Sequence, residues 1–125
     1  MRAFWRQLVN EAGRDATCLI TTDAELRRLN REFRAKDSPT DVLSFPSHAD
    51  APELGEIAIS WDRAVAQAAE MGHGADAEVR VLMVHGLLHL MGLDHETDSG
   101  EMRRAEAKWR KKLGLPAGLI ERVPA

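Results

Sequence analysis

Three of the five histidines in the chain lie within eleven residues, at His85, His89 and His95. His85 and His89 are four positions apart, so on a helix they lie one turn apart on the same face, as two ligands of one metal ion do. Gly92 follows where a helix can end at positive φ, and such a turn would bring His95 back toward the same point. The spacing therefore predicts a metal site made of three histidines.

The chemistry expected of this site is that of catalytic zinc. Neutral imidazole is the commonest protein ligand of zinc, and three protein ligands with one open position are typical of a catalytic site. The only cysteine is Cys18, which excludes a site closed by several cysteines. One Zn2+ ion with an open position lowers the pKa of its bound water to about 7 and polarises a phosphoryl or carbonyl oxygen.

Two interpretations compete with parts of this prediction. His85 and His89 would instead be core histidines if every ring nitrogen found a hydrogen bond, since burying an unpaired nitrogen in an apolar helix is costly. Asp94 would either hold the ring N–H of a ligand or only shape the turn before His95. The residues alone leave the role of Asp94 open.

The residue after the first histidine separates this site from a group of proteases with the same spacing. The pattern H-x3-H-x2-G-x2-H also occurs in the metzincin proteases, where Glu follows the first His and acts as general base. Here that position is Gly86, which cannot take a proton. Peptide hydrolysis by that mechanism would need a base from elsewhere in the chain.

The elements that must position the histidines follow from apolar spacing and turn residues. Helices are predicted over residues 3–12, 23–34, 61–71, 75–91 and 99–113, and strands over residues 16–21, 41–45 and 55–60. The helix over 75–91 is polar for one turn and then apolar all round, which is typical of a helix buried on most sides. We predict an α+β fold in a single domain over residues 1–125, with a mixed sheet of roughly three to four strands, about five helices and the metal site at a cleft.

Individual positions carry further expectations. Thr22 begins a capping-box sequence, Ser60 is expected to cap the third helix, and Asp98 or Ser99 the last one. Side chains that the spacing turns toward the interior include Phe33, Val65 and Met71, whereas Glu78 belongs to the polar turn and His48 and His73 are expected on surface loops.

Composition places the chain in solution. No run of 18 uncharged apolar residues occurs, the first residues lack the apolar core of a signal peptide, and a lone cysteine agrees with a reducing compartment. We expect a cytoplasmic protein without a membrane partner.

A basic cluster precedes the predicted turn after the second helix. The net charge of −3 argues mildly against broad nucleic-acid binding, yet Arg27, Arg28, Arg31, Arg34 and Lys36 are close in sequence, and the planar fork of Arg suits phosphate. For Arg27 and Arg28 we prefer a solvated helix face with acidic partners. Arg31, Arg34 and Lys36 are the candidates for RNA binding, and Arg34 at the helix end could stabilise charge developing on a phosphate.

The stretch His85-Gly-Leu-Leu-His89-Leu-Met-Gly92-Leu-Asp94-His95 resembles the signature of the bacterial YbeY family, and residues 29–46 and 55–60 match that family in order. The resemblance implies a single-domain, metal-dependent endoribonuclease that cuts single-stranded RNA in rRNA precursors, acts in 16S 3′-end maturation and ribosome quality control, and contacts small-subunit ribosomal proteins. The resemblance also implies that the three histidines bind the zinc and that Arg34 and His85 have catalytic roles.

One departure from the family pattern concerns the sheet. Family members usually have a strand before the first helix, and this chain starts almost inside that helix, so three strands and an exposed sheet edge are expected. Two other functions stay open: a metallohydrolase acting on peptides or small molecules, and a non-catalytic ribosome-associated module braced by its metal.

Overall fold

The computed structural model of the chain describes residues 1–34, 40–94 and 97–116. Within these ranges the predicted α+β class is confirmed by five helices and a three-stranded mixed sheet. In chain order the elements are α1 (Arg2–Ala12), β1 (Asp15–Thr21), α2 (Asp23–Arg34), β2 (Val42–Pro46), β3 (Glu53–Ser60), α3 (Trp61–Met71), α4 (Ala75–Leu90) and α5 (Glu101–Leu113).

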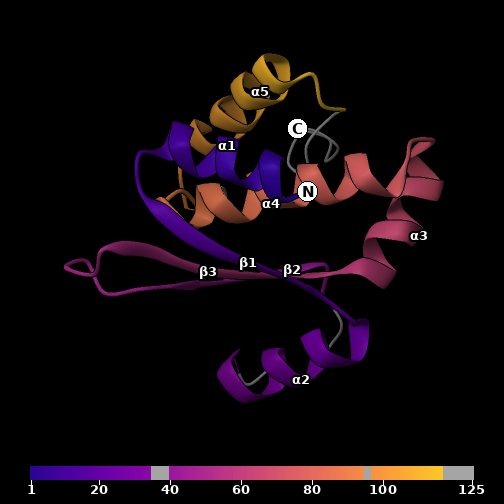
Figure 1. The fold of residues 1–125 in the computed structure, drawn as a ribbon, viewed down its shortest axis with the longest axis horizontal. Coiled ribbons are helices and arrows are strands. Elements are labelled where there is room, and N and C mark those ends of the chain that lie inside the picture. Colours follow the sequence, from indigo (N-terminus) through magenta and orange to yellow (C-terminus); the bar gives the residue numbers. More distant parts are fainter. Residues whose placement is uncertain (35–39, 95–96, 117–125) are drawn as a thin grey trace.

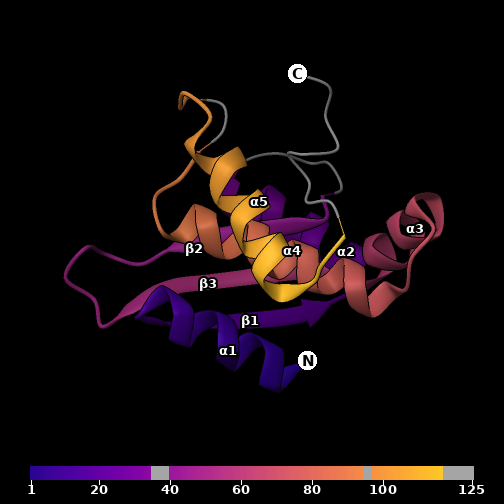
Figure 2. The same cartoon turned by 90° about the horizontal axis from the view of Figure 1, so that it is seen from above.

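The sheet separates α2 from α1, α4 and α5 (Figure 1). Its strand order is β1-β3-β2, with β1 parallel and β2 antiparallel to the central strand β3. Helices α1, α4 and α5 lie on one side of the sheet and α2 lies on the other (Figure 1). Seen from above, α1 runs along β1 and α5 lies over α4 (Figure 2). The histidine-bearing helix α4 is thus enclosed between the sheet and α5.

Helix α4 is the centre of the fold, as its apolar sequence predicted. Eleven of its 16 residues are buried, including Leu82, Leu87 and Leu88. Burying a side chain of this size contributes about 1.5–3 kcal/mol. None of the described helices is long and apolar enough to cross a membrane.

Two predicted caps form the expected hydrogen bonds. The Thr22 hydroxyl accepts from the Glu25 N–H at 3.1 Å, and the Ser60 hydroxyl accepts from the Arg63 N–H at 3.1 Å. The prediction for α5 is wrong, because its N-cap is Gly100 rather than Asp98 or Ser99, although the Asp98 carboxylate accepts from the Met102 N–H at 2.9 Å. Each such bond satisfies a helix N–H that the first turn leaves without an intrahelical partner.

The exposed sheet edge is also present. Strand β1 is the outermost strand on its side, and its Leu19 and Ile20 side chains are 50% and 37% exposed. Strand β2 forms the other edge. Strand β3 begins at Glu53, two residues before the predicted start, because Asp15 of β1 pairs with Glu53.

Several side-chain placements predicted from helical spacing are wrong. Val65 and Met71 are 44% and 46% exposed, because α3 packs through the small residues Ala64 and Ala68, which are buried. Phe33 is 66% exposed. Its ring lies edge-on to that of the partly buried Phe45, with 5.8 Å between the ring centroids.

The polar turn of α4 also differs from expectation. Glu78 is fully buried, because its carboxylate lies 2.6 Å from the Nε2 atom of His73. His73 is consequently half-buried rather than a surface histidine, whereas His48 is exposed as expected. A buried carboxylate requires such a partner, and the partner here comes from the loop before the helix.

Candidate metal centre

His85 and His89 lie side by side on α4. Their ring centroids are 4.8 Å apart, and the planes meet edge-on at 78°. His85 is buried, with 7% of its surface exposed, and His89 is half-buried. Two imidazoles that meet at the end of a buried helix, one of them beside solvent, form an arrangement that suits two ligands of one ion.

Glu106 contacts the first of these histidines and was missed by the sequence reasoning. Its Oε2 atom lies 3.0 Å from Nδ1 of His85, and the residue is only 1% exposed. One signal for it existed, because Glu106 is four positions after Met102 on the inner face predicted for α5. A carboxylate at a core position of an amphipathic helix marks a buried polar contact.

The turn after α4 has the geometry predicted from Gly92. The Gly92 N–H donates to the carbonyl of His89 at 3.0 Å, and its φ of 95° lies in the left-handed region that favours glycine. Asp94 is half-buried, and its backbone carbonyl accepts from the N–H groups of Thr97 and Asp98 at 3.2 and 3.1 Å. The backbone of Asp94 therefore shapes the turn, and a role of its side chain toward a ligand stays a prediction.

His95 lies outside the described residues. Among the residues that are described, no three His, Cys, Asp or Glu side chains form a group that could hold a metal ion. The structure thus places two of the three predicted ligands together, and the complete ligand set stays a prediction.

Gly86 faces the sheet. The Ser44 hydroxyl donates to the Gly86 carbonyl at 3.2 Å, and a Cβ atom at position 86 would lie 3.1 Å from two side-chain carbons of Ile57. Such distances are shorter than the 3.5–4.0 Å that carbon atoms prefer, as a rough guide. A glutamate at this position would crowd Ile57 of β3 and Val42 of β2, which gives a packing reason for the absence of the protease base.

The arginines of α2 differ in their surroundings. Arg28 donates to Glu25 and to Glu32, both at 2.9 Å, and its hydrogen bond lowers the pKa of the Glu25 carboxyl. The solvated helix face preferred for Arg28 is therefore confirmed. Arg31 is exposed, Arg34 is described as the last residue of α2, and Lys36 lies outside the described residues.

The end of α2 and the histidine turn of α4 approach the same strand from opposite faces. Phe33, next to Arg34, contacts Phe45, while Gly86, next to His85, is hydrogen-bonded to Ser44. Strand β2, which both helices contact, is an edge strand of the sheet.

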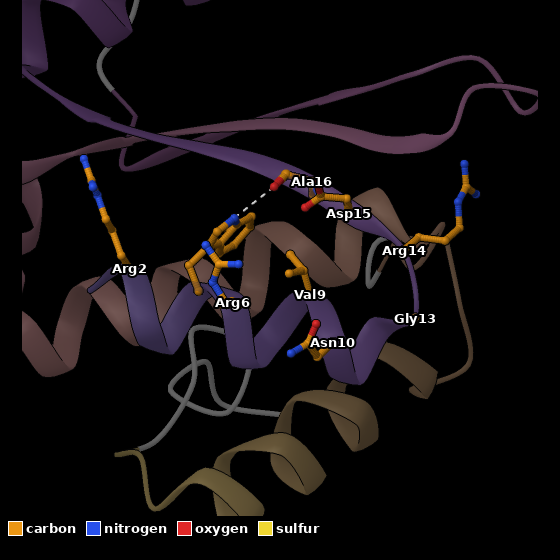
Figure 3. A pocket seen from close by; sticks show the side chains of 9 residues that line it. Arg2, Arg6, Val9, Asn10, Gly13, Arg14, Asp15 and Ala16 are labelled. Atoms are coloured by element: carbon orange, nitrogen blue, oxygen red, sulfur yellow. Dashed lines mark hydrogen bonds between the residues drawn. The ribbon is translucent and has the colours of Figure 1, made fainter.

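A separate hollow of about 600 Å³ lies between α1 and β1. Arg2, Arg6 and Arg14 are spread along it, and the Trp5 indole N–H donates to the Ala16 carbonyl at 2.9 Å (Figure 3). Its lining contains no histidine, and the guanidinium group of Arg14 donates to the Ala51 carbonyl at 2.6 Å. This hollow is therefore not the predicted metal site.

Comparison with known proteins gives one consistent result. A family model described as endoribonuclease YbeY matches residues 4–114. A protein named endoribonuclease YbeY from Solibacter usitatus is 59% identical over 122 residues, covering 96% of this chain and 82% of that protein. A protein of the same name from Koribacter versatilis is 57% identical over 105 residues, covering 84% of this chain and 68% of that protein.

A solved structure agrees with the fold. The solution structure of a protein from Thermotoga maritima superimposes with a TM-score of 0.63 at 29% sequence identity, covering 90% of this chain and 77% of that chain. The similarity therefore supports the fold over most of the chain.

Proposed function

Because the chain belongs to the endoribonuclease YbeY family, a family of enzymes that cut RNA, we propose that it is a zinc-dependent endoribonuclease for single-stranded RNA. Its substrate would be an rRNA precursor in the cytoplasm, with a role in maturing the 3′ end of 16S rRNA, in ribosome quality control and in contact with proteins of the small subunit.

The observation that carries this proposal is the paired arrangement of His85 and His89. Their rings are 4.8 Å apart at one end of a buried helix, and Nδ1 of His85 is already engaged by Glu106. The donors fit zinc, since neutral imidazole nitrogens are its commonest protein ligands. We propose His95 as the third ligand. When bound, the ion supplies Lewis acidity, which polarises a phosphoryl oxygen and allows water or a hydroxyl group to ionise near neutral pH.

Arg34 is proposed to bind the scissile phosphate. A guanidinium group donates two parallel hydrogen bonds to a phosphate and stabilises the charge that develops on it. Support for this role comes from its place in the sequence, as the last residue of α2 and two positions before Lys36. Arg31 and Lys36 would then contact neighbouring phosphates of the RNA.

Two nucleophiles are compatible with these groups, water and the ribose 2′-OH. The RNA ends distinguish them, because attack by the 2′-OH leaves a 2′,3′-cyclic phosphate whereas attack by water does not. If all products of the purified protein ended in a cyclic phosphate, the version with activated water would be wrong.

The alternatives predict different results. A peptidase of the metzincin type would need a base at position 86, where the residue is Gly and a larger side chain would crowd Ile57. A non-catalytic module braced by its metal would unfold when the metal is removed, whereas the proposed enzyme would lose RNA cleavage and keep its fold.

The direct test combines metal analysis with cleavage of single-stranded RNA in three variants. His89→Ala should lose both zinc and cleavage, and the matched control His48→Ala, which removes an exposed histidine, should keep both. Arg34→Ala should keep zinc and lose about 100- to 1,000-fold in rate. A His89→Ala protein with full zinc content would refute the ligand assignment.

A further inference from the structure

Glu106 is a buried charge in a place where the fold alone would favour an apolar residue. It lies on α5 in the layer of Met102, which is fully buried, and is itself 1% exposed. Taking a carboxylate out of water costs several kcal/mol, and replacing a buried ion pair by well-packed apolar residues is often neutral or stabilising. The position of Glu106 therefore points to a task besides packing.

The contact of Glu106 determines which nitrogen of His85 carries the proton. An ionised carboxylate only accepts hydrogen bonds, so an ionised Glu106 with its Oε2 atom 3.0 Å from Nδ1 of His85 requires Nδ1 to be the donor. In a neutral ring with the proton on Nδ1, the lone pair of Nε2 is left for another partner. Arg110, one turn later on α5, lines the same small cavity as Glu106.

We infer that Glu106 is a positioning residue, which holds His85 as the Nδ1–H tautomer and so presents Nε2 as the ligand atom. This inference rests on the proposed metal site and adds to it a residue from a separate helix. Through this contact α5 fixes the ring orientation of a ligand on α4 before any ion binds. The histidine then loses no further rotational freedom when it coordinates the ion, which raises metal affinity.

A second histidine–carboxylate pair in the same molecule provides a matched control. Glu78 is fully buried on α4, and its carboxylate lies 2.6 Å from Nε2 of His73. The two glutamates thus share burial and a histidine partner. Glu78 lies seven residues before His85 on the helix, about 10 Å along its axis. Glu106→Gln and Glu78→Gln therefore make the same chemical change beside the proposed site and away from it.

The experiment measures two properties of the full chain: the imidazole tautomers by 15N NMR in protein stripped of metal, and zinc affinity by calorimetric titration. In wild type, His85 should show the Nδ1–H tautomer. Glu106→Gln introduces a neutral amide that accepts more weakly and can also donate, so His85 should become a tautomer mixture and zinc affinity should fall about 10- to 100-fold. Glu78→Gln should leave zinc affinity unchanged, whatever its effect on stability.

Two results would overturn the inference: an Nε2–H tautomer of His85 in the wild type, or equal zinc affinity for Glu106→Gln and wild type. The first needs no variant, so the test stands even if Glu106→Gln fails to fold. These outcomes differ from a failure of the proposed function, which would appear as wild-type protein that binds no zinc.

Discussion

Position 86 allows a quantitative test of the packing between α4 and the sheet. A Cβ atom there would lie 3.1 Å from Cδ1 and Cγ2 of Ile57 and 3.2 Å from Cγ2 of Val42. Gly86→Ala gains about 1 kcal/mol in helix propensity, while overpacking of a core costs about 1–3 kcal/mol. We expect overpacking to win, with the free energy of unfolding reduced by about 1 kcal/mol.

A double-mutant cycle with Ile57→Val isolates the contact. That substitution removes the Cδ1 methyl and alone should cost about 0.5–1.5 kcal/mol. In the Gly86→Ala background the same methyl crowds the new Cβ atom, so its removal relieves strain. The loss of unfolding free energy in the double variant should therefore be smaller than the sum of the two single losses by at least about 0.5 kcal/mol.

The assay is urea unfolding of metal-free protein, followed by circular dichroism. Gly74→Ala is the control, because a Cβ atom there meets nothing within 4 Å, and its effect should add to that of Ile57→Val. Additive effects at position 86, or a Gly86→Ala protein more stable than wild type, would refute the claim that a side chain at this position crowds Ile57. The packing reason for the missing protease base would then fail as well.

Two further predictions concern other parts of the fold. Asp98→Ala removes a carboxylate that accepts from the Gly100 and Met102 N–H groups, both at 2.9 Å, and urea unfolding should show a loss of about 1 kcal/mol. Burial raises the pKa of Cys18 to about 12, so the folded protein should react with a thiol reagent at pH 8 far more slowly than the protein in urea. Because the pKa of Cys18 is higher in the folded than in the unfolded protein, the stability contributed by the neutral thiol is complete below the unfolded pKa of about 8.5 and is lost as the pH rises toward 12. Cys18→Ala should therefore weaken the decline of the unfolding free energy over that pH range. An unchanged decline would contradict the assignment.

Local signals in the sequence were sufficient for most of the fold. Thr22 and Ser60 predict where their helices begin, because a cap forms its hydrogen bond within the first turn. The apolar run through α4 predicts a central helix, because a helix that is apolar on every side is a buried one. Spacing was less reliable for α3, where Ala64, Val65, Ala68 and Met71 are predicted as one inner stripe and only the two alanines are buried. Which part of the stripe is buried depends on how closely α3 approaches α4, which is a tertiary property.

The predicted site was only partly accessible to the same reasoning. The spacing of His85 and His89 predicts their proximity, since both lie on one helix. The spacing after Met102 could have marked Glu106 as buried, but it could not assign the residue to His85, because this partner lies 21 positions earlier on another helix.

The central claim is that RNA cleavage depends on one zinc ion held by the histidines of α4 and the following turn. Its most direct test is a zinc titration of metal-free wild-type protein, in which bound zinc and the rate of single-stranded RNA cleavage are measured on the same samples. We predict that both rise together and reach their plateau at one ion per chain. Full cleavage by the metal-free protein would contradict the account.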